Sequence, residues 1–217
     1  MLNLFTYVIE HDLGLAPNPF FGYCTLAVCK SDIRKNKALK IGDWIVGTGS
    51  KSLETKSQRK QIGKLIYAME VNEIIPVEEY WNDIRFQDKK PNIYGSLVKM
   101  YGDNIYEKDT DGKWIQHLSA HSLPNGEVNE EYIIDDIRGK RILISTNFYY
   151  FGDNSIDIPK DFSNFIVKKQ GYKYKDFNPN DIEKFISWIK SLKTSPGIYG
   201  DPIDWINYSQ TNLLGEF

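Results

Sequence analysis

The chain has 217 residues, of which 41% are hydrophobic and 26% charged, and its formal net charge is -2. These values are typical of a soluble globular protein with a real core, so they exclude a disordered chain and an overall positive field that would attract nucleic acid. No apolar run approaches the roughly 20 residues that span a bilayer, and no basic flank of a signal peptide precedes the first apolar stretch, so we expect a cytoplasmic protein with no membrane partner.

The first quarter of the chain alternates extended segments with turns. Residues 4–9 (LFTYVI) predict a strand, and residues 22–30 (GYCTLAVCK) predict a second extended segment that leads into a short helical turn or loop. Between them lies HDLGLAPNPFFG, whose two prolines favour a rigid and irregular loop. Such a loop either satisfies its own polar groups or presents Asp12 and Asn18 to a ligand.

Cys24 and Cys29 are five residues apart in the second extended segment. An odd separation on a strand sends the two side chains to opposite faces, so we expect no disulfide between them. We interpret both as small buried apolar residues.

The central elements are less regular. Residues 44–46 (WIV) predict a short buried strand, residues 47–51 (GTGSK) a flexible polar loop, and residues 64–76 one long strand that ends where Pro76 opens a helix. Residues from about 83 to 138 show no lasting period and are interpreted as a long inserted excursion. Residues 141–145 (RILIS) then predict a clear strand.

The C-terminal region contains the best-defined helix. Asn178 is expected to cap it, Pro179 to enter it, and one apolar face to form from Ile182, Phe185, Ile186, Ile189 and Leu192. We expect a single domain over residues 1–217, with a helical C-terminal extension at about 176–217.

The stretch GTGSKS is similar to a phosphate loop but does not fit its pattern, because Ser50 stands where the Walker sequence requires its second glycine. No helix start is evident after it. The segment is either a plain loop between elements or a weak anion site made of backbone N–H groups beside Lys51.

Positive charge gathers between residues 51 and 64, where Glu54 is the single acidic residue. The stretch is either a solvated charged loop or a local contact for a phosphate backbone. Its candidate phosphate contacts are Lys56, Arg59, Lys60 and Lys64.

Three histidines provide the candidate acid–base groups. His117 and His121 are spaced as H-x-x-x-H, but Pro124 soon ends any helix there and no cysteine is near in sequence, so we expect no metal and a hydrogen-bonding role for His121. His11 and Asp12 are adjacent and point apart on an extended chain. His11, Asp12 and His121 are the candidate catalytic residues. The candidate nucleophiles by residue type are Cys24, Ser50 and Ser122, and no spacing selects among them.

Several segments together resemble the nucleotide modification associated domain 2 family, from Tyr7 to about Trp205. They are HDLGLAPNPF, CTLAVCKSDIRK, IGDWIVGTGSK, EEYWNDIRFQDKKP, YGDNIY, SAHS and ILISTNFYYFG. The order of the elements also resembles the PUA-like superfamily that includes EVE, YTH and ASCH domains. This resemblance implies an α+β fold, a PUA-like mixed β-barrel of the EVE/ASCH type with peripheral helices and a C-terminal amphipathic helix.

The resemblance implies recognition of a modified base or nucleotide in DNA or RNA, within a nucleic-acid modification or phage defence system, and without a cofactor. EVE and YTH domains hold a modified base in an aromatic-lined pocket. Here HDLGLAPNPF and GTGSK would form facing walls. The residues expected to bind are Asn18, Trp44, Thr48, Ser50, Lys51 and Trp81.

Two alternatives remain open from the sequence. One is an enzyme acting on a nucleotide or modified base through His11 and Asp12, with His121 in support. The other is a protein-interaction adaptor, which an exposed aromatic patch within residues 92–118 would favour. The sequence identifies no particular protein partner.

Overall fold

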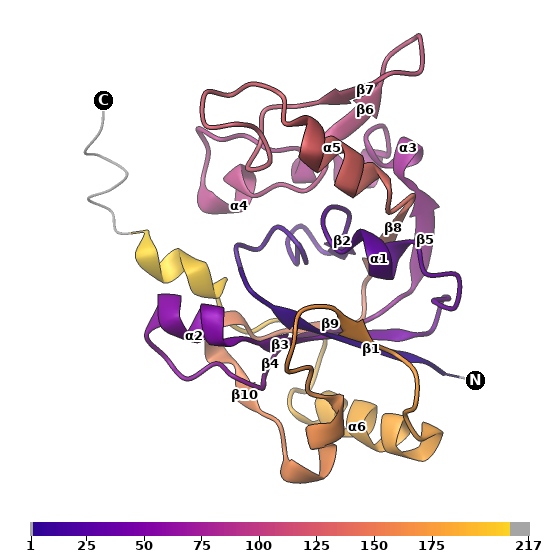
Figure 1. The fold of residues 1–217 in the computed structure, drawn as a ribbon, viewed down its shortest axis with the longest axis vertical. Helices are drawn as coiled ribbons and strands as arrows, with labels where there is room; N and C mark the ends of the chain where they lie inside the picture. The colour runs from indigo at the N-terminus through magenta and orange to yellow at the C-terminus, as the bar shows by residue number, and fades with distance from the viewer. Residues whose placement is uncertain (1, 209–217) are drawn as a thin grey trace. The chain divides into compact units, whose positions relative to one another are not determined.

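The computed structural model describes residues 2–208, and its contacts divide the chain into two compact units. Unit 1 contains the residues up to 13, residues 43–70 and the residues from 147 onward; unit 2 contains residues 14–42 and 71–146. Each unit is described by itself. The predicted α+β class is confirmed, because both units combine sheets with helices (Figure 1).

Unit 1 is built on a seven-stranded sheet in the order β11-β1-β3-β4-β9-β12, with β10 also paired to β4. Pairing is parallel between β1 and β3 and between β9 and β12, and antiparallel elsewhere. The strands are β1 (Leu4–Ile9), β3 (Trp44–Gly49), β4 (Lys64–Glu70), β9 (Phe148–Tyr150), β10 (Ile156–Asp157), β11 (Tyr172–Lys173) and β12 (Gly197–Ile198).

The helices of unit 1 include the predicted C-terminal one. The α-helices are α2 (Lys51–Ser57) and α6 (Pro179–Ser191), and the 3-10 helices are η2 (Gly152–Asn154), η3 (Lys160–Phe165) and η4 (Ile203–Asn207). The Asn178 side chain accepts the Asn180 N–H at 2.9 Å, and the apolar face of α6 packs in one core with Leu4, Trp44 and Tyr149. The cap, entry and face of this helix are confirmed; residues 209–217 of the expected extension lie outside the described residues.

Unit 2 holds a three-stranded antiparallel sheet in the order β2-β8-β5 and a separate hairpin of β6 and β7. The strands are β2 (Cys24–Leu26), β5 (Glu73–Pro76), β6 (Tyr106–Lys108), β7 (Trp114–Gln116) and β8 (Arg141–Ser145). The helices are α1 (Ser31–Arg34), α3 (Val77–Tyr80), η1 (Ile84–Lys89), α4 (Leu97–Met100) and α5 (Glu130–Ile137). Its core includes Ile75, Phe86 and Ile142.

The structure has open sheets where the sequence predicts a barrel. Within residues 2–208 the strands form open sheets and no closed barrel, since the largest sheet ends at β11 on one side and at β12 on the other. Short edge strands of two residues each terminate the ladder, so few backbone groups remain for closure. A more distant PUA-like relationship stays a prediction, as does the single-domain organisation.

The predicted long strand over residues 64–76 is wrong, because β4 ends at Glu70 and β5 begins at Glu73 in another sheet. Asn72 stands at the break, and its side-chain oxygen accepts the backbone N–H of Thr146 at 2.8 Å. Such a side-chain bond gives the backbone an alternative to a continuous ladder.

The predicted flexible loop over residues 47–51 is also wrong. Strand β3 continues to Gly49, and α2 starts at Lys51 after Ser50, whose hydroxyl accepts the Leu53 N–H at 3.0 Å. A Cβ at Gly49 would lie 2.1 Å from the carbonyl oxygen of Gln61, so this glycine permits a close backbone approach.

No helix among the residues described is long and apolar enough to cross a membrane. Cys24 and Cys29 form no disulfide, as expected.

Candidate functional site

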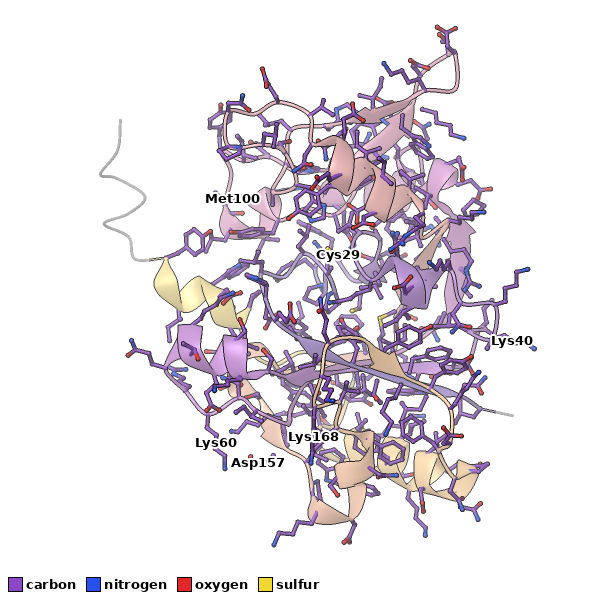
Figure 2. The ribbon with its side chains drawn as sticks, viewed as in Figure 1. Cys29, Lys40, Lys60, Met100, Asp157 and Lys168 are labelled. Atoms are coloured by element: carbon purple, nitrogen blue, oxygen red, sulfur yellow. The ribbon has the colours of Figure 1, made fainter. Side chains whose placement is uncertain are left out.

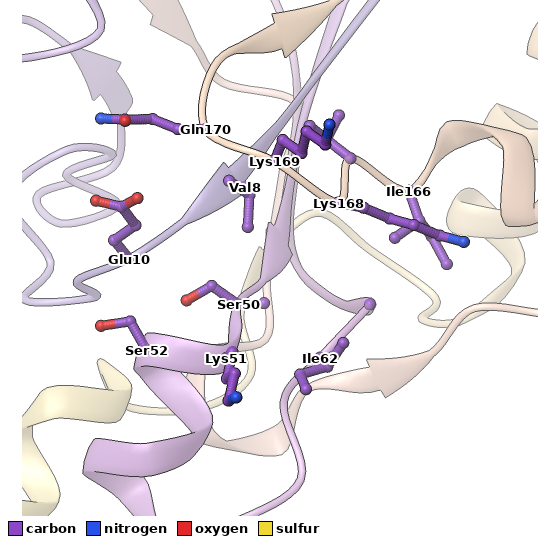
Figure 3. Close-up of a pocket in the computed structure, with 13 residues that line it drawn as sticks. Val8, Glu10, Ser50, Lys51, Ser52, Ile62, Ile166, Lys168, Lys169 and Gln170 are labelled. Atoms are coloured by element: carbon purple, nitrogen blue, oxygen red, sulfur yellow. The ribbon is translucent and has the colours of Figure 1, made fainter.

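Unit 1 contains a cavity of about 580 Å³ bordered by four parts of that unit (Figure 3). Strand β1 contributes Val8, and Glu10 directly follows that strand. The start of α2 contributes Lys51 after its cap residue Ser50, residues 62–63 form a third part, and the segment 166–170 forms the fourth. The volume lies within the range of roughly 300–1,000 Å³ that is usual for small-molecule sites.

The walls of this cavity combine positive charge with aliphatic surface. Lys51, Lys168 and Lys169 line it together with one carboxylate, that of Glu10, while Val8 and Ile166 supply apolar surface. The three lysines are exposed. Ammonium groups at the rim of an apolar hollow favour an anionic ligand with a flat or apolar portion.

Two of the residues predicted to bind, Ser50 and Lys51, line this cavity. Ser50 is 8% exposed, and its hydroxyl caps α2. Thr48 is fully buried and donates to the carbonyl oxygen of Tyr7 at 3.3 Å.

Trp44 lies in the core of unit 1 and is 2% exposed. It packs with the face of α6, and the Lys190 ammonium lies 5.3 Å from its ring centroid. The expected stacking of a base on Trp44 would therefore require the core to open.

The basic stretch offers less free charge than its sequence indicates. Arg59 lies 3.9 Å from Asp153, and Lys64 lies 3.7 Å from Asp157. Lys56 has its ammonium 2.9 Å from His11 Nδ1, and Lys60 is exposed (Figure 2). A phosphate-backbone role for these four residues stays a prediction.

His11 and Asp12 have different surroundings. Asp12 is buried, accepts hydrogen bonds from the Tyr150 hydroxyl and the Ile203 N–H, and has its pKa raised to about 6 because burial outweighs those bonds. The His11 side chain is 63% exposed and lies 3.8 Å from Asp204. Both residues lie near Asp204, whose Oδ2 also accepts the backbone N–H of Asp12 at 2.9 Å, and each stays a candidate.

Asn18 belongs to unit 2 and is fully buried there. Its side chain donates to the carbonyl oxygen of Tyr101 at 3.0 Å and accepts from the Lys89 ammonium at 2.6 Å. Burial lowers the pKa of Lys89 to about 8. The polar groups of Asn18 thus hold its own loop, whose Ala16–Pro17 bond is cis.

Trp81 also lies in unit 2, where the ring of His117 stacks on it with centroids 3.9 Å apart. The Lys90 ammonium is 3.7 Å from the same ring centroid. The expected pocket thus draws residues from both units, and its two facing walls stay a prediction.

A cluster that the sequence did not reveal occurs in unit 2. Cys29 Sγ lies 3.6 Å from His121 Nε2, and His121 Nδ1 lies 2.7 Å from Asp136 Oδ2. Asp136 also accepts the Tyr106 hydroxyl at 2.7 Å and the Cys29 N–H. Residues 29, 121 and 136 are far apart in sequence, and no spacing could join them.

His121 itself is buried, and its ring stacks on Tyr132 with centroids 4.3 Å apart. Burial alone would lower its pKa, but the hydrogen bonds to Asp136 and Cys29 outweigh that effect and raise the pKa to about 10. The expectation of a hydrogen-bonding role for His121 is met. His117, by contrast, pairs with Glu107 at 2.7 Å.

The thiol, imidazole and carboxylate of the Cys29 cluster are also ligand types of zinc, and their candidate ligand atoms lie within 4.8 Å of one another. The absence of a metal and of a cofactor stays a prediction.

The comparisons with known proteins give one family. The profile of the family "Nucleotide modification associated domain 2" matches residues 1–209. No curated protein and no solved structure matches the chain. Since the family match covers nearly the whole chain, the protein belongs to the nucleotide modification associated domain 2 family.

Proposed function

We propose that the protein recognises a modified base or nucleotide in DNA or RNA, as part of a nucleic-acid modification or defence system. The family supports a role in such systems. The observation that carries the proposal is the cavity of unit 1, where Lys51, Lys168 and Lys169 surround aliphatic walls.

Each part of the cavity suits one part of a nucleotide. The lysines would attract phosphate oxygens, and the hydroxyl of Ser52 could donate to them. Val8, Ile62 and Ile166 would contact the apolar face of a sugar or base. Exposed lysines give attraction that salt screens, so binding should weaken as ionic strength rises.

The base would meet aliphatic side chains here and not the aromatic cage expected from EVE-type domains. No aromatic residue contributes to the described wall of the cavity. Selectivity for a modification would then come from shape and from polar atoms such as those of Glu10 and Gln170.

Fluorescence anisotropy tests the proposal. The panel contains short DNA and RNA oligonucleotides, single and double stranded, plain or carrying modified cytosines, adenines or deazaguanines, at two salt concentrations. We expect one modified member to bind at least about tenfold more tightly than its plain counterpart, which corresponds to about 1.4 kcal/mol. The double variant Lys51→Glu with Lys168→Glu should weaken binding. It should also flatten the plot of the logarithm of the binding constant against the logarithm of the salt concentration, by about 0.7–0.9 in slope for each phosphate that the variant no longer neutralises.

Lys184→Glu is the matched control, since Lys184 is exposed on α6 and does not line the cavity. Equal affinity of the double variant and the native chain would contradict the assignment of the cavity. A panel in which nothing binds at either salt concentration would contradict recognition itself.

A second candidate, the protein-interaction adaptor, is favoured by one observation. Tyr94 is 89% exposed and lies within the excursion where such a patch was expected. Tyr94→Ala should then abolish capture of a protein partner and leave anisotropy unchanged.

A further inference from the structure

The Cys29 cluster has the connectivity of a nucleophile, a base and an orienting carboxylate. Asp136 contacts one ring nitrogen of His121 at 2.7 Å, and the other ring nitrogen faces the sulfur of Cys29 at 3.6 Å. This order suits thiol catalysis, because the carboxylate fixes the ring so that its far nitrogen meets the nucleophile.

The fold holds Cys29 and Asp136 in place through Arg34, which is fully buried. Its guanidinium donates to the carbonyl oxygens of Ala27, Cys29 and Asp136. Cys29 itself has a φ of 53°, a conformation that residues with a side chain adopt uncommonly and that recurs at functional sites. Its side chain is partly exposed, whereas His121 and Asp136 are buried.

The distances favour hydrogen bonding over metal coordination. Tetrahedral zinc with bonds of about 2.0–2.3 Å keeps its ligand atoms more than about 3 Å apart. The 2.7 Å between His121 Nδ1 and Asp136 Oδ2 is the length of a charge-assisted hydrogen bond. With Asp136 also accepting from Tyr106 and the Cys29 backbone, its oxygens are engaged in orienting the site.

We propose that Cys29 is the nucleophile of a second functional site, which transfers or hydrolyses an acyl group held as an amide or ester, with His121 as acid and base and Asp136 as its positioning residue. This proposal does not rest on nucleotide binding in unit 1. The raised pKa of His121 is consistent with an imidazolium that lies beside the sulfur of Cys29.

The chemistry balances in two steps. The Cys29 thiolate attacks the acyl carbon, the bond from that carbon to nitrogen or oxygen breaks, and the leaving amine or alcohol takes the proton from His121 Nε2. Water then attacks the resulting thioester while neutral His121 accepts one of its protons. The acyl group leaves as a carboxylic acid, and the thiolate–imidazolium pair is restored.

The first test is alkylation of the intact, folded chain by iodoacetamide at neutral pH. Peptide mass spectrometry of the digested chain then measures how fast each cysteine is labelled. Cys24 provides an internal control, because it is fully buried and burial raises its pKa. We expect Cys29 to be alkylated at least tenfold faster than Cys24, and His121→Gln to slow the labelling of Cys29 at least tenfold.

His117→Gln is the matched control, since His117 also pairs with a carboxylate at 2.7 Å but lies outside the Cys29 cluster. It should leave the labelling rate of Cys29 unchanged. Thermal unfolding midpoints of both variants separate loss of the fold from loss of reactivity, and Cys29→Ser serves as a second variant if His121→Gln does not fold.

Acylation is tested with p-nitrophenyl acetate. We expect one burst of nitrophenolate per chain, an acetyl group on the peptide that contains Cys29, and neither of these in Cys29→Ser. A Cys29 rate equal in the native chain and in a folded His121→Gln variant would overturn the proposal. So would one zinc ion per purified chain that is absent from Cys29→Ser.

Discussion

Asp12 is a carboxylate whose properties are set by its neighbours in space. It is fully buried, with the Tyr150 hydroxyl and the Ile203 N–H donating to its two oxygens. Burial disfavours the charged form more than these bonds favour it, so the pKa rises from 3.8 to about 6. The folded chain therefore binds this proton more strongly than the unfolded chain does.

This pKa predicts a stability that falls as pH rises from about 4 to 6. Below that window both states carry the proton and the contribution is fully present; above it the contribution, roughly 3 kcal/mol, is lost. Asp12→Asn cannot titrate, so the difference in free energy of unfolding between native chain and variant should be larger at pH 4 than at pH 7. Urea unfolding at both values measures it, and a difference independent of pH would contradict the assignment.

Cys24 and Cys29 differ in burial and in the groups that surround their thiols. Cys24 is fully buried in β2, and burial raises its pKa. Cys29, five residues on, is partly exposed with an imidazole 3.6 Å from its sulfur. Strand β2 ends at Leu26 and Cys29 has a φ of 53°, so strand alternation does not set the direction of the Cys29 side chain, and contacts across the fold distinguish the chemistry of the two cysteines.

Helices α2 and α6 differ in how many local signals in the sequence predict them. Helix α6 has a cap, an entering proline and an apolar face of several turns, all local signals. Helix α2 has seven residues and follows Gly49, so its cap at Ser50 is its main local signal. Short helices depend on tertiary packing more than on propensity.

The cap of α6 gives a prediction at this scale. Asn178→Ala removes the acceptor for the Asn180 N–H and should lower the free energy of unfolding by about 1 kcal/mol. Asn180→Ala is the control, since only the backbone N–H of Asn180 enters the cap. Urea unfolding followed by circular dichroism compares the two, and equal losses would exclude the cap as the cause.

At the scale of the whole molecule, the chain passes between the two units four times, after residues 13, 42, 70 and 146. Each unit therefore assembles from segments that are distant in sequence. Unit 1 has a core around α6, and unit 2 has a core around Phe86 and β8. Separate cores favour separate cooperative units.

Phe185→Ala tests this organisation, since Phe185 is fully buried in the core of unit 1. The cavity should cost about 3–5 kcal/mol. In native-state hydrogen exchange we expect amide groups of β3 and β4 to lose that protection while those of β5 and β8 keep theirs. Equal loss in both units would instead support the single domain that the sequence predicts.

Local signals in the sequence determined the α+β class, strand β1, and the cap and face of α6, because each depends on neighbouring residues. Ser50 and Lys51 were also picked out by sequence, and both line the cavity of unit 1. The family followed from motifs along most of the chain.

Tertiary structure alone decided which polar residues are buried and which meet. Trp44 has the character of a stacking surface in sequence but lies in the core, because α6 packs over it from more than 130 residues away. The long strand over 64–76 breaks at Asn72, whose partner Thr146 belongs to a distant segment. Cys29, His121 and Asp136 form one cluster for the same physical reason: contact depends on how the chain returns through space, and that path is set by packing.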